Sequence, residues 1–174
     1  MAAVERMPVG VVVERQPARS RWLDHVWRVA AVLPGDPETP PWTLLAEEDG
    51  TVRYYAGTAP LEAHSADTKV YKHNLEAPEP AVYVVLRPGG GPGSGPGGWR
   101  LLLATVDPAE AHAHSDCGDD LVEALPMPQA VRDWLAAFVA RHHVERQEWR
   151  RKRDRADPEI LAARRARRLE DGDG

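Results

Sequence analysis

The sequence predicts an α+β fold: a mostly antiparallel sheet of about six or seven strands, packed by two or three helices. Short runs rich in β-branched and aromatic residues alternate with turns that contain Gly or Pro, which is typical of strands joined as hairpins. Three segments between or after these runs carry helix signals, either a capping residue or apolar residues at helical spacing. With 174 residues, the chain is long enough to close a core without disulfides or metals.

The strand signal is strongest near the N-terminus. Two apolar runs at residues 9–13 and 22–33 flank a polar connection at residues 16–21, so they predict a pair of antiparallel strands. A loop follows at residues 34–41, because the four prolines there disfavour both helix and sheet. Further strands are expected at residues 42–46, 51–56, 81–86 and 100–106, and residues 121–125 should form a short strand or an extended segment.

Turn residues indicate how the next strands are joined. Asp49-Gly50 is a favoured turn pair, so it predicts a second hairpin. A further turn is predicted at Gly57, after which residues 59–64 continue the sheet. Pro60 places that segment at a sheet edge, because proline cannot donate a backbone hydrogen bond.

Three helices are predicted. Ser65 should cap a short helix that runs to Leu75. Asp107 should cap a second helix, with the carboxylate of Glu110 reaching back to the cap. The main packing helix is expected at residues 129–144, with an apolar face that covers the sheet. That face consists of Val131, Trp134, Leu135, Phe138 and Val139.

Residues 88–98 contain only Gly, Pro and one Ser. Such a segment has no side chains that could offset the entropy lost on ordering its backbone, so we expect a flexible hairpin loop. A phosphate-binding loop leads directly into the N-terminus of a helix, whereas here Trp99 opens a strand. The glycines therefore do not predict a nucleotide site.

Charge and composition divide the chain into a domain at residues 1–144 and a basic tail at residues 145–174. The domain holds 12 Lys and Arg against 19 Asp and Glu, a net charge of −7, whereas the tail holds 10 against 8, a net charge of +2. The tail has little apolar surface, so we expect it to be mobile, either disordered or helical, and to order on a protein partner. Its candidate partner-binding residues are Arg150, Arg151, Lys152, Arg153 and Arg155.

One cluster could in principle bind a metal ion. His112, His114, Asp116 and Cys117 are all possible ligands, but a spacing of two residues separates the two histidines by about 200° around a helix. No second cysteine supports a zinc site, and no nucleophile motif or paired-carboxylate signature stands out. We therefore expect no metal, no cofactor and no catalytic residue.

Composition also bounds location and partners. Cys117 is the single cysteine, so no intrachain disulfide can form and a reducing cytoplasm is expected. No apolar run reaches the roughly 20 residues that a membrane span needs. Nucleic-acid binding is not expected, because the domain is acidic and lacks a stripe of interleaved aromatic and basic residues.

The chain resembles an uncharacterised family of short proteobacterial proteins, a domain of unknown function. Five segments carry the resemblance: MPVGVVVERQPARSRWLDHVWRVAAVLPG, YYAGTAPLEAHSADTKVYKHNL, PAVYVVLR, VEALPMP and FVARHHVERQEWRRKRDR. The similarity runs from about Met7 to Arg155 and breaks mainly at the Gly/Pro loop. Members of this family are typically encoded beside formate dehydrogenase subunits and molybdenum-cofactor maturation genes, and some carry an automatic label as molybdopterin-guanine dinucleotide biosynthesis protein A.

The resemblance implies a functional neighbourhood. A nucleotidyltransferase of the labelled kind places a glycine-rich phosphate loop directly after its first strand, whereas here that strand is followed by Glu14-Arg15-Gln16-Pro17, without glycine. The resemblance therefore implies a non-enzymatic accessory protein that supports assembly or maturation of a molybdenum-dependent formate dehydrogenase. Its expected partner is a formate dehydrogenase subunit or a maturation factor. The alternative is a small enzyme or metal-binding protein of molybdenum-cofactor biosynthesis.

Overall fold

The computed structural model describes residues 2–116 and 118–144, and those as far as His143 belong to one compact unit. In chain order the strands and α-helices of these residues are β1 (Val4–Pro17), β2 (His25–Pro34), β3 (Thr43–Glu48), β4 (Thr51–His64), α1 (Thr68–Glu76), β5 (Ala81–Arg87), β6 (Arg100–Thr105), α2 (Pro108–Ser115), β7 (Leu121–Pro126) and α3 (Gln129–His142).

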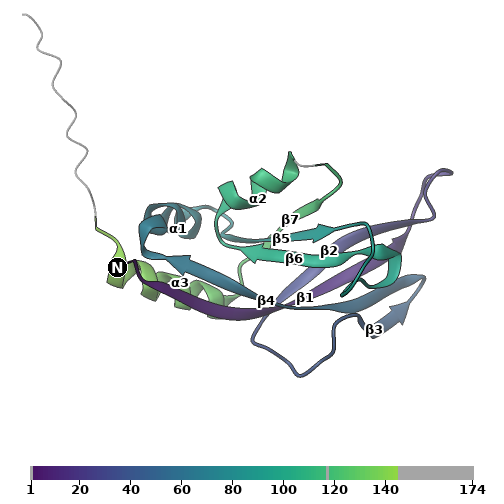
Figure 1. Ribbon diagram of the computed structural model, residues 1–174, viewed down its shortest axis with the longest axis horizontal. Helices are drawn as coiled ribbons and strands as arrows, with labels where there is room; N and C mark the ends of the chain where they lie inside the picture. Colours follow the sequence, from purple (N-terminus) through teal and green to yellow (C-terminus); the bar gives the residue numbers. More distant parts are fainter. Residues whose placement is uncertain (1, 117, 145–174) are drawn as a thin grey trace, which may run out of the picture. The chain divides into compact units, whose positions relative to one another are not determined.

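The seven strands of the described residues form two antiparallel sheets (Figure 1). One has four strands in the order β2-β1-β4-β3, and the other has three in the order β6-β5-β7. The predicted α+β class and the number of strands are confirmed, but the single sheet that we expected is divided in two. Helix α1 interrupts the chain between β4 and β5, so the later strands pair among themselves.

Strand β1 lies at the centre of the larger sheet, between β2 and β4. Val9, Val11 and Val13 are fully buried, so the N-terminal apolar run forms core as expected. Trp22 differs from the expectation. It lies in the connection between β1 and β2 and is 91% exposed, because β2 begins only at His25.

Strand β4 does not turn at Gly57, as the sequence predicted, but continues through it. The register between β1 and β4 shifts between Val11 and Val12, which leaves Ala56 as the extra residue of a β-bulge. Gly57 adopts a φ of +139°, which side chains disfavour. Beyond the bulge, Pro60 lies where β3 no longer pairs with β4, so its predicted edge position is confirmed.

The connections between strands are largely those predicted. Residues 35–42 form a loop. Asp49 and Gly50 form a hairpin turn with φ of +51° and +81°, the left-handed values that a two-residue turn of this kind requires. Residues 88–98 form the hairpin loop between β5 and β6, but two of its glycines lie against tryptophan rings. The loop therefore has packing partners that its sequence did not indicate, and its flexibility stays a prediction.

The hydrophobic core lies between the two sheets, where β4 runs beside β6 and β2 beside β7. Helices α1 and α3 pack against this core and against each other, with the rings of Tyr71 and Phe138 in edge contact at 6.4 Å. Helix α2 covers the other face of the smaller sheet (Figure 1), where Val85 and Ala111 are fully buried. Strand β5 is thus buried on both faces, as its apolar sequence predicts.

Two of the predicted capping contacts are replaced by others. Ser65 does not cap α1, because its hydroxyl accepts a hydrogen bond from the backbone N–H of Ala3 at 3.0 Å. Asp107 caps α2 as predicted, accepting from a backbone N–H of the first turn at 2.8 Å. Glu110 does not reach back to this cap and instead accepts from the hydroxyl of Thr105, at the end of β6, at 2.5 Å.

Helix α3 confirms most of the predicted packing face. Val131, Leu135 and Phe138 are fully buried, and Val139 is nearly so. Trp134 is only partly buried and therefore flanks the contact with the core. The helix ends at His142, two residues before the predicted end.

Candidate functional site

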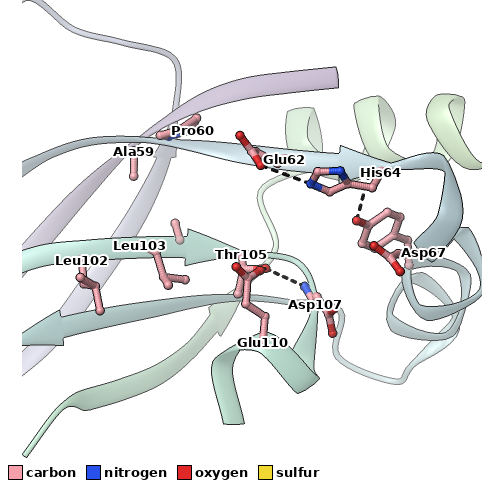
Figure 2. A pocket seen from close by; sticks show the side chains of 12 residues that line it. Ala59, Pro60, Glu62, His64, Asp67, Leu102, Leu103, Thr105, Asp107 and Glu110 are labelled. Atoms are coloured by element: carbon pink, nitrogen blue, oxygen red, sulfur yellow. Dashed lines mark hydrogen bonds and ion pairs between the residues drawn. The ribbon is translucent and has the colours of Figure 1, made fainter. Parts of the chain in front are cut away.

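A cavity of about 460 Å³ opens between the second half of β4 and β6, and we call it the β4–β6 groove (Figure 2). It is lined by Ala59, Pro60, Glu62, His64, Asp67, Tyr71, Leu102, Leu103, Ala104, Thr105, Asp107 and Glu110.

The groove lies where β4 and β6 run beside each other without backbone pairing. Strand β3 pairs with β4 only from Thr51 to Tyr55, so among the described residues no strand is hydrogen-bonded to the outer edge of β4 beyond Gly57, although β6 runs beside β4. Strand β6 pairs with β5 on one side and has no hydrogen-bonded strand on the other among the described residues. Pro60 adds no backbone N–H to the open edge. The groove is therefore bounded by two strand edges that have no ladder partner on the groove side among the described residues.

The polar lining of the groove is mainly acidic. Glu62 lies on β4, Asp67 just before α1, and Asp107 and Glu110 at the start of α2. Figure 2 shows Glu62 on one side of the opening and Thr105 with Glu110 on the other. Carboxylates from three separate elements thus face one opening, where they attract positively charged groups.

Most of these carboxylates are also engaged within the fold. Glu62 accepts a hydrogen bond from Nε of Arg6 at 2.7 Å, across the β1–β4 pair, and its other oxygen lies 3.2 Å from Nε2 of His64. The hydrogen bond from Arg6 holds the pKa of the Glu62 carboxyl below its usual value, although burial opposes this effect. Asp107 caps α2, and Glu110 accepts the hydrogen bond from Thr105, as described above.

Tyr71 lies at the inner end of the groove and is 2% exposed. Its hydroxyl accepts a hydrogen bond from the backbone N–H of His64 at 3.1 Å. Burial raises the pKa of the phenol, and the nearby carboxylates of Asp67, Asp107 and Glu110 raise it further. The phenol therefore stays protonated at neutral pH, where it can donate a hydrogen bond but is not a nucleophile.

The histidines that could have bound a metal are separated by the structure. His112 is exposed, whereas Nδ1 of His114 lies 3.5 Å from the carboxylate of Asp120. That carboxylate is already bound by the guanidinium of Arg87 through two hydrogen bonds of 2.9 and 2.8 Å. Within residues 2–116 and 118–144, no group of three or more His, Cys, Asp or Glu side chains could hold a metal ion. Cys117 lies outside the described residues.

The predicted partner-binding residues Arg150, Arg151, Lys152, Arg153 and Arg155 also lie outside the described residues, so their role stays a prediction. Sequence reasoning missed the groove itself. Pro60 carried a usable signal, since it marked an open strand edge. Asp107 and Glu110 were interpreted only as helix-start residues. Nothing in the local sequence of Glu62 or Asp67 indicated that these two carboxylates would line the same groove as Asp107 and Glu110.

The fold and the groove define a small α+β protein with an open, acidic groove between two strand edges. Residues 8–153 match the family described as "Protein of unknown function (DUF3305)", and because this match covers most of the chain, the protein belongs to that family. The expected membership of an uncharacterised domain family is thus confirmed. No curated protein and no solved structure shows a significant match. Among the described residues, no helix is long and apolar enough to span a membrane.

Proposed function

We propose that this protein is a non-enzymatic accessory protein, which binds a subunit or maturation factor of a molybdenum-dependent formate dehydrogenase and supports its assembly. The choice of enzyme rests on the resemblance described above, because relatives are encoded beside formate dehydrogenase and molybdenum-cofactor genes. The binding role is supported by the β4–β6 groove. A cytoplasmic setting, expected from the single cysteine, belongs to the same proposal.

One observation carries the binding role: acidic side chains of the groove are held by contacts that maintain the fold. Glu62 pairs with Arg6, and Asp107 caps α2. Glu110 accepts from Thr105. These hydrogen bonds fix the positions of the carboxylates along the groove. Charges that are held in place suit the recognition of another chain.

The chemistry of the groove also indicates what kind of segment it would take. Open strand edges can pair with an extended peptide through backbone hydrogen bonds. The acidic lining favours Lys or Arg side chains on that peptide. We therefore propose that the groove receives an extended, positively charged segment of the partner.

A pull-down from the native host tests this function. The tagged full-length protein should co-purify formate dehydrogenase subunits or their maturation factors. The double variant Glu62→Gln with Asp67→Asn removes two groove charges and keeps the shape of both side chains. It should recover about fivefold less partner, because an exposed charge contact is worth up to about 1 kcal/mol. The control Glu38→Gln with Glu47→Gln makes the same change of net charge at exposed positions outside the groove and should bind as the wild type does.

The same purified protein distinguishes the alternative function. If it carries one equivalent of a metal ion, or binds a nucleotide with saturable affinity, a small enzyme or metal-binding protein of cofactor biosynthesis becomes the better proposal. If formate dehydrogenase components are absent from the pull-down and neither ligand binds, both functions are rejected.

A further inference from the structure

The connection between β1 and β2, residues 18–24, carries the most exposed large apolar side chain among the described residues, and we call it the hairpin tip. Trp22 is 91% exposed, and the adjacent Leu23 is 60% exposed. Figure 1 shows this connection at the end of β1 that lies away from the N-terminus. The fold therefore presents two neighbouring apolar side chains on a loop that makes no contribution to the core.

Hydrogen bonds hold the hairpin tip in shape. The backbone N–H of Ala18 donates to the carbonyl of Asp24 at 3.1 Å, which closes the loop. Within it, the hydroxyl of Ser20 accepts from the backbone N–H of Trp22 at 3.2 Å. A loop that is ordered before binding loses less entropy when it binds, and tryptophan is enriched among the residues that anchor interfaces. The tip thus has the form of a preorganised binding element.

Two arginines accompany the apolar pair. Arg19 and Arg21 are exposed, and among the described residues neither guanidinium is held by an ion pair. Asp24 is the single carboxylate of residues 18–24, so the tip is locally positive although residues 1–144 carry a net charge of −7. The surface complementary to the tip is a hollow that combines apolar side chains with carboxylates.

The β4–β6 groove has this combination. Leu102 and Leu103 line it and are partly exposed. Arg6 balances the charge of Glu62, but the groove carboxylates of Asp67, Asp107 and Glu110 have no basic partner among the described residues. The volume of about 460 Å³ lies in the range of pockets that enclose a small organic ligand, so the groove can take protruding side chains.

The hairpin tip cannot reach the groove of its own chain. Arg6 pairs with Glu62 beside the groove, whereas Pro17 directly precedes the tip. The strand between Arg6 and Pro17 spans roughly 36 Å at about 3.3 Å per residue. The sheet holds β1 on both sides, so it cannot bend the tip back over that distance. A contact between tip and groove therefore requires two copies of the chain.

We propose that this protein self-associates, with the hairpin tip of one copy inserted into the β4–β6 groove of another. Trp22 and Leu23 meet the leucines of the groove, and the arginines of the tip face its carboxylates. The inference rests on the proposed function in one respect, since both take the groove to be a binding site. It adds a form of regulation, because a groove that holds a tip is closed to a partner segment.

Sedimentation velocity of the purified full-length protein tests the proposal. The average mass of the wild type should rise with concentration, and Trp22→Ala should weaken this association at least about tenfold, because it removes the anchor. Leu45→Ala is the control, since it truncates an exposed apolar side chain on β3 outside both surfaces. Asp67→Lys should weaken association at least about fivefold by repelling the arginines. Its control is Glu38→Lys, the same charge reversal at an exposed position outside the groove.

A mixture of the Trp22→Ala and Asp67→Lys variants gives the sharpest result. It should contain dimers that neither variant forms alone, because the groove of the first and the tip of the second are intact. The proposal is overturned if the wild type stays monomeric up to about 1 mM. It is also overturned if the wild type associates but the mixture is no more associated than its components, since another surface would then be responsible.

Other occupants of the tip are distinguished in the same experiments. A monomeric wild type that sediments with phosphatidylglycerol vesicles would assign the tip to a lipid surface. A monomeric wild type whose pull-down fails in Trp22→Ala would assign the tip to another protein. Both results reject self-association. The sedimentation runs contain no partner, so a monomeric protein that still recovers formate dehydrogenase components keeps the proposed function, whereas self-association without such recovery rejects that function alone.

Discussion

Asn74 shows how a single buried polar residue connects three parts of this fold. Its side-chain amide donates to the carbonyls of Ala81 and Val106, each at 2.9 Å, and its oxygen accepts from the N–H of Ala81 at 3.0 Å. The residue is 5% exposed, so water cannot replace these bonds. Asn74 thereby joins α1 to the start of β5 and to the residue that follows β6, and it satisfies backbone groups that would otherwise be buried without partners.

Asn74→Ala should therefore lower the free energy of unfolding by about 3 kcal/mol or more, because three buried hydrogen bonds are lost and their backbone partners stay desolvated. Urea denaturation followed by circular dichroism measures this change. His73→Ala, at the exposed neighbouring position of the same helix, is the control and should change stability by less than about 0.5 kcal/mol. A loss under about 1 kcal/mol for Asn74→Ala would contradict the assigned network.

Asp120 predicts a dependence of stability on pH. Its side chain is 4% exposed and accepts two hydrogen bonds from Arg87, which hold the pKa of its carboxyl below the usual value in the folded protein. A group whose pKa is lowered by folding stabilises the protein above its unfolded pKa, about 3.9 for aspartate. That stabilisation is lost as the pH falls through the lower, folded pKa.

Asp120→Asn should lower the free energy of unfolding at pH 7 by about 1–2 kcal/mol, because a charge-assisted pair becomes a neutral contact. The difference between wild type and variant should shrink as the pH is lowered below about 4 and should vanish when the wild-type carboxyl is protonated. Urea denaturation at a series of pH values checks both parts. A difference that is constant with pH would show that the variant acts through packing alone.

At the scale of elements, α3 supplies the main contact between helix and core. Leu135 and Phe138 are fully buried on it, and Phe138 lies between the ring of Tyr71 and that of His142, whose centroids are 6.4 and 4.5 Å away. Trp134, which the sequence placed on the same face, is only partly buried. The helix therefore packs through a narrower stripe than its sequence indicates.

Phe138→Ala should destabilise the protein by about 3–5 kcal/mol, because it leaves a cavity between α1 and α3 that neighbouring rings cannot fill. Trp134→Ala should cost about 1–2 kcal/mol, since part of that side chain already contacts water. Thermal or urea unfolding of the two variants gives the comparison. If both variants lost the same free energy of unfolding, Trp134 would be as deeply packed as Phe138. Helix α3 would then be rotated about its axis relative to the orientation given above.

At the scale of the whole molecule, the charges are divided between an acidic domain and a basic C-terminal segment. The predicted partner-binding residues lie in that segment, outside the described residues. Salt screens the attraction between such a cluster and an acidic partner at distances beyond a Debye length, which is roughly 10 Å at 0.1 M. A role in docking therefore has a measurable signature.

Replacing the five basic residues Arg150, Arg151, Lys152, Arg153 and Arg155 by Gln should leave the melting temperature unchanged, because they contribute little apolar surface. The complex of the wild type with its partner should weaken between low and physiological salt, whereas the complex of the variant should depend much less on salt. Arg164→Gln with Arg165→Gln serves as the control outside the cluster. Identical salt dependence in all three proteins would exclude the cluster as a docking element.

Much of the secondary structure could be predicted because its causes are local. The valines of β1 alternate within a few residues, and Asp49-Gly50 suits a two-residue turn whatever lies elsewhere in the chain. The cap at Asp107 depends only on the first turn of α2. The error at Gly57 has a physical reason: glycine permits both a turn and a bulge, and only the pairing with β1 determined which one formed.

The sequence by itself determined the α+β class, the number of strands and the family of this protein, since periodicity, turn residues and similarity are all readable along the chain. Only the tertiary structure decided the division into two sheets, the facing carboxylates of the β4–β6 groove and the position of the Gly/Pro loop against the rings of Trp27 and Trp42. The hydrogen bond from Trp42 to Gly93 joins residues 51 positions apart. Contacts of that kind depend on how sheets pack, and no local pattern encodes them.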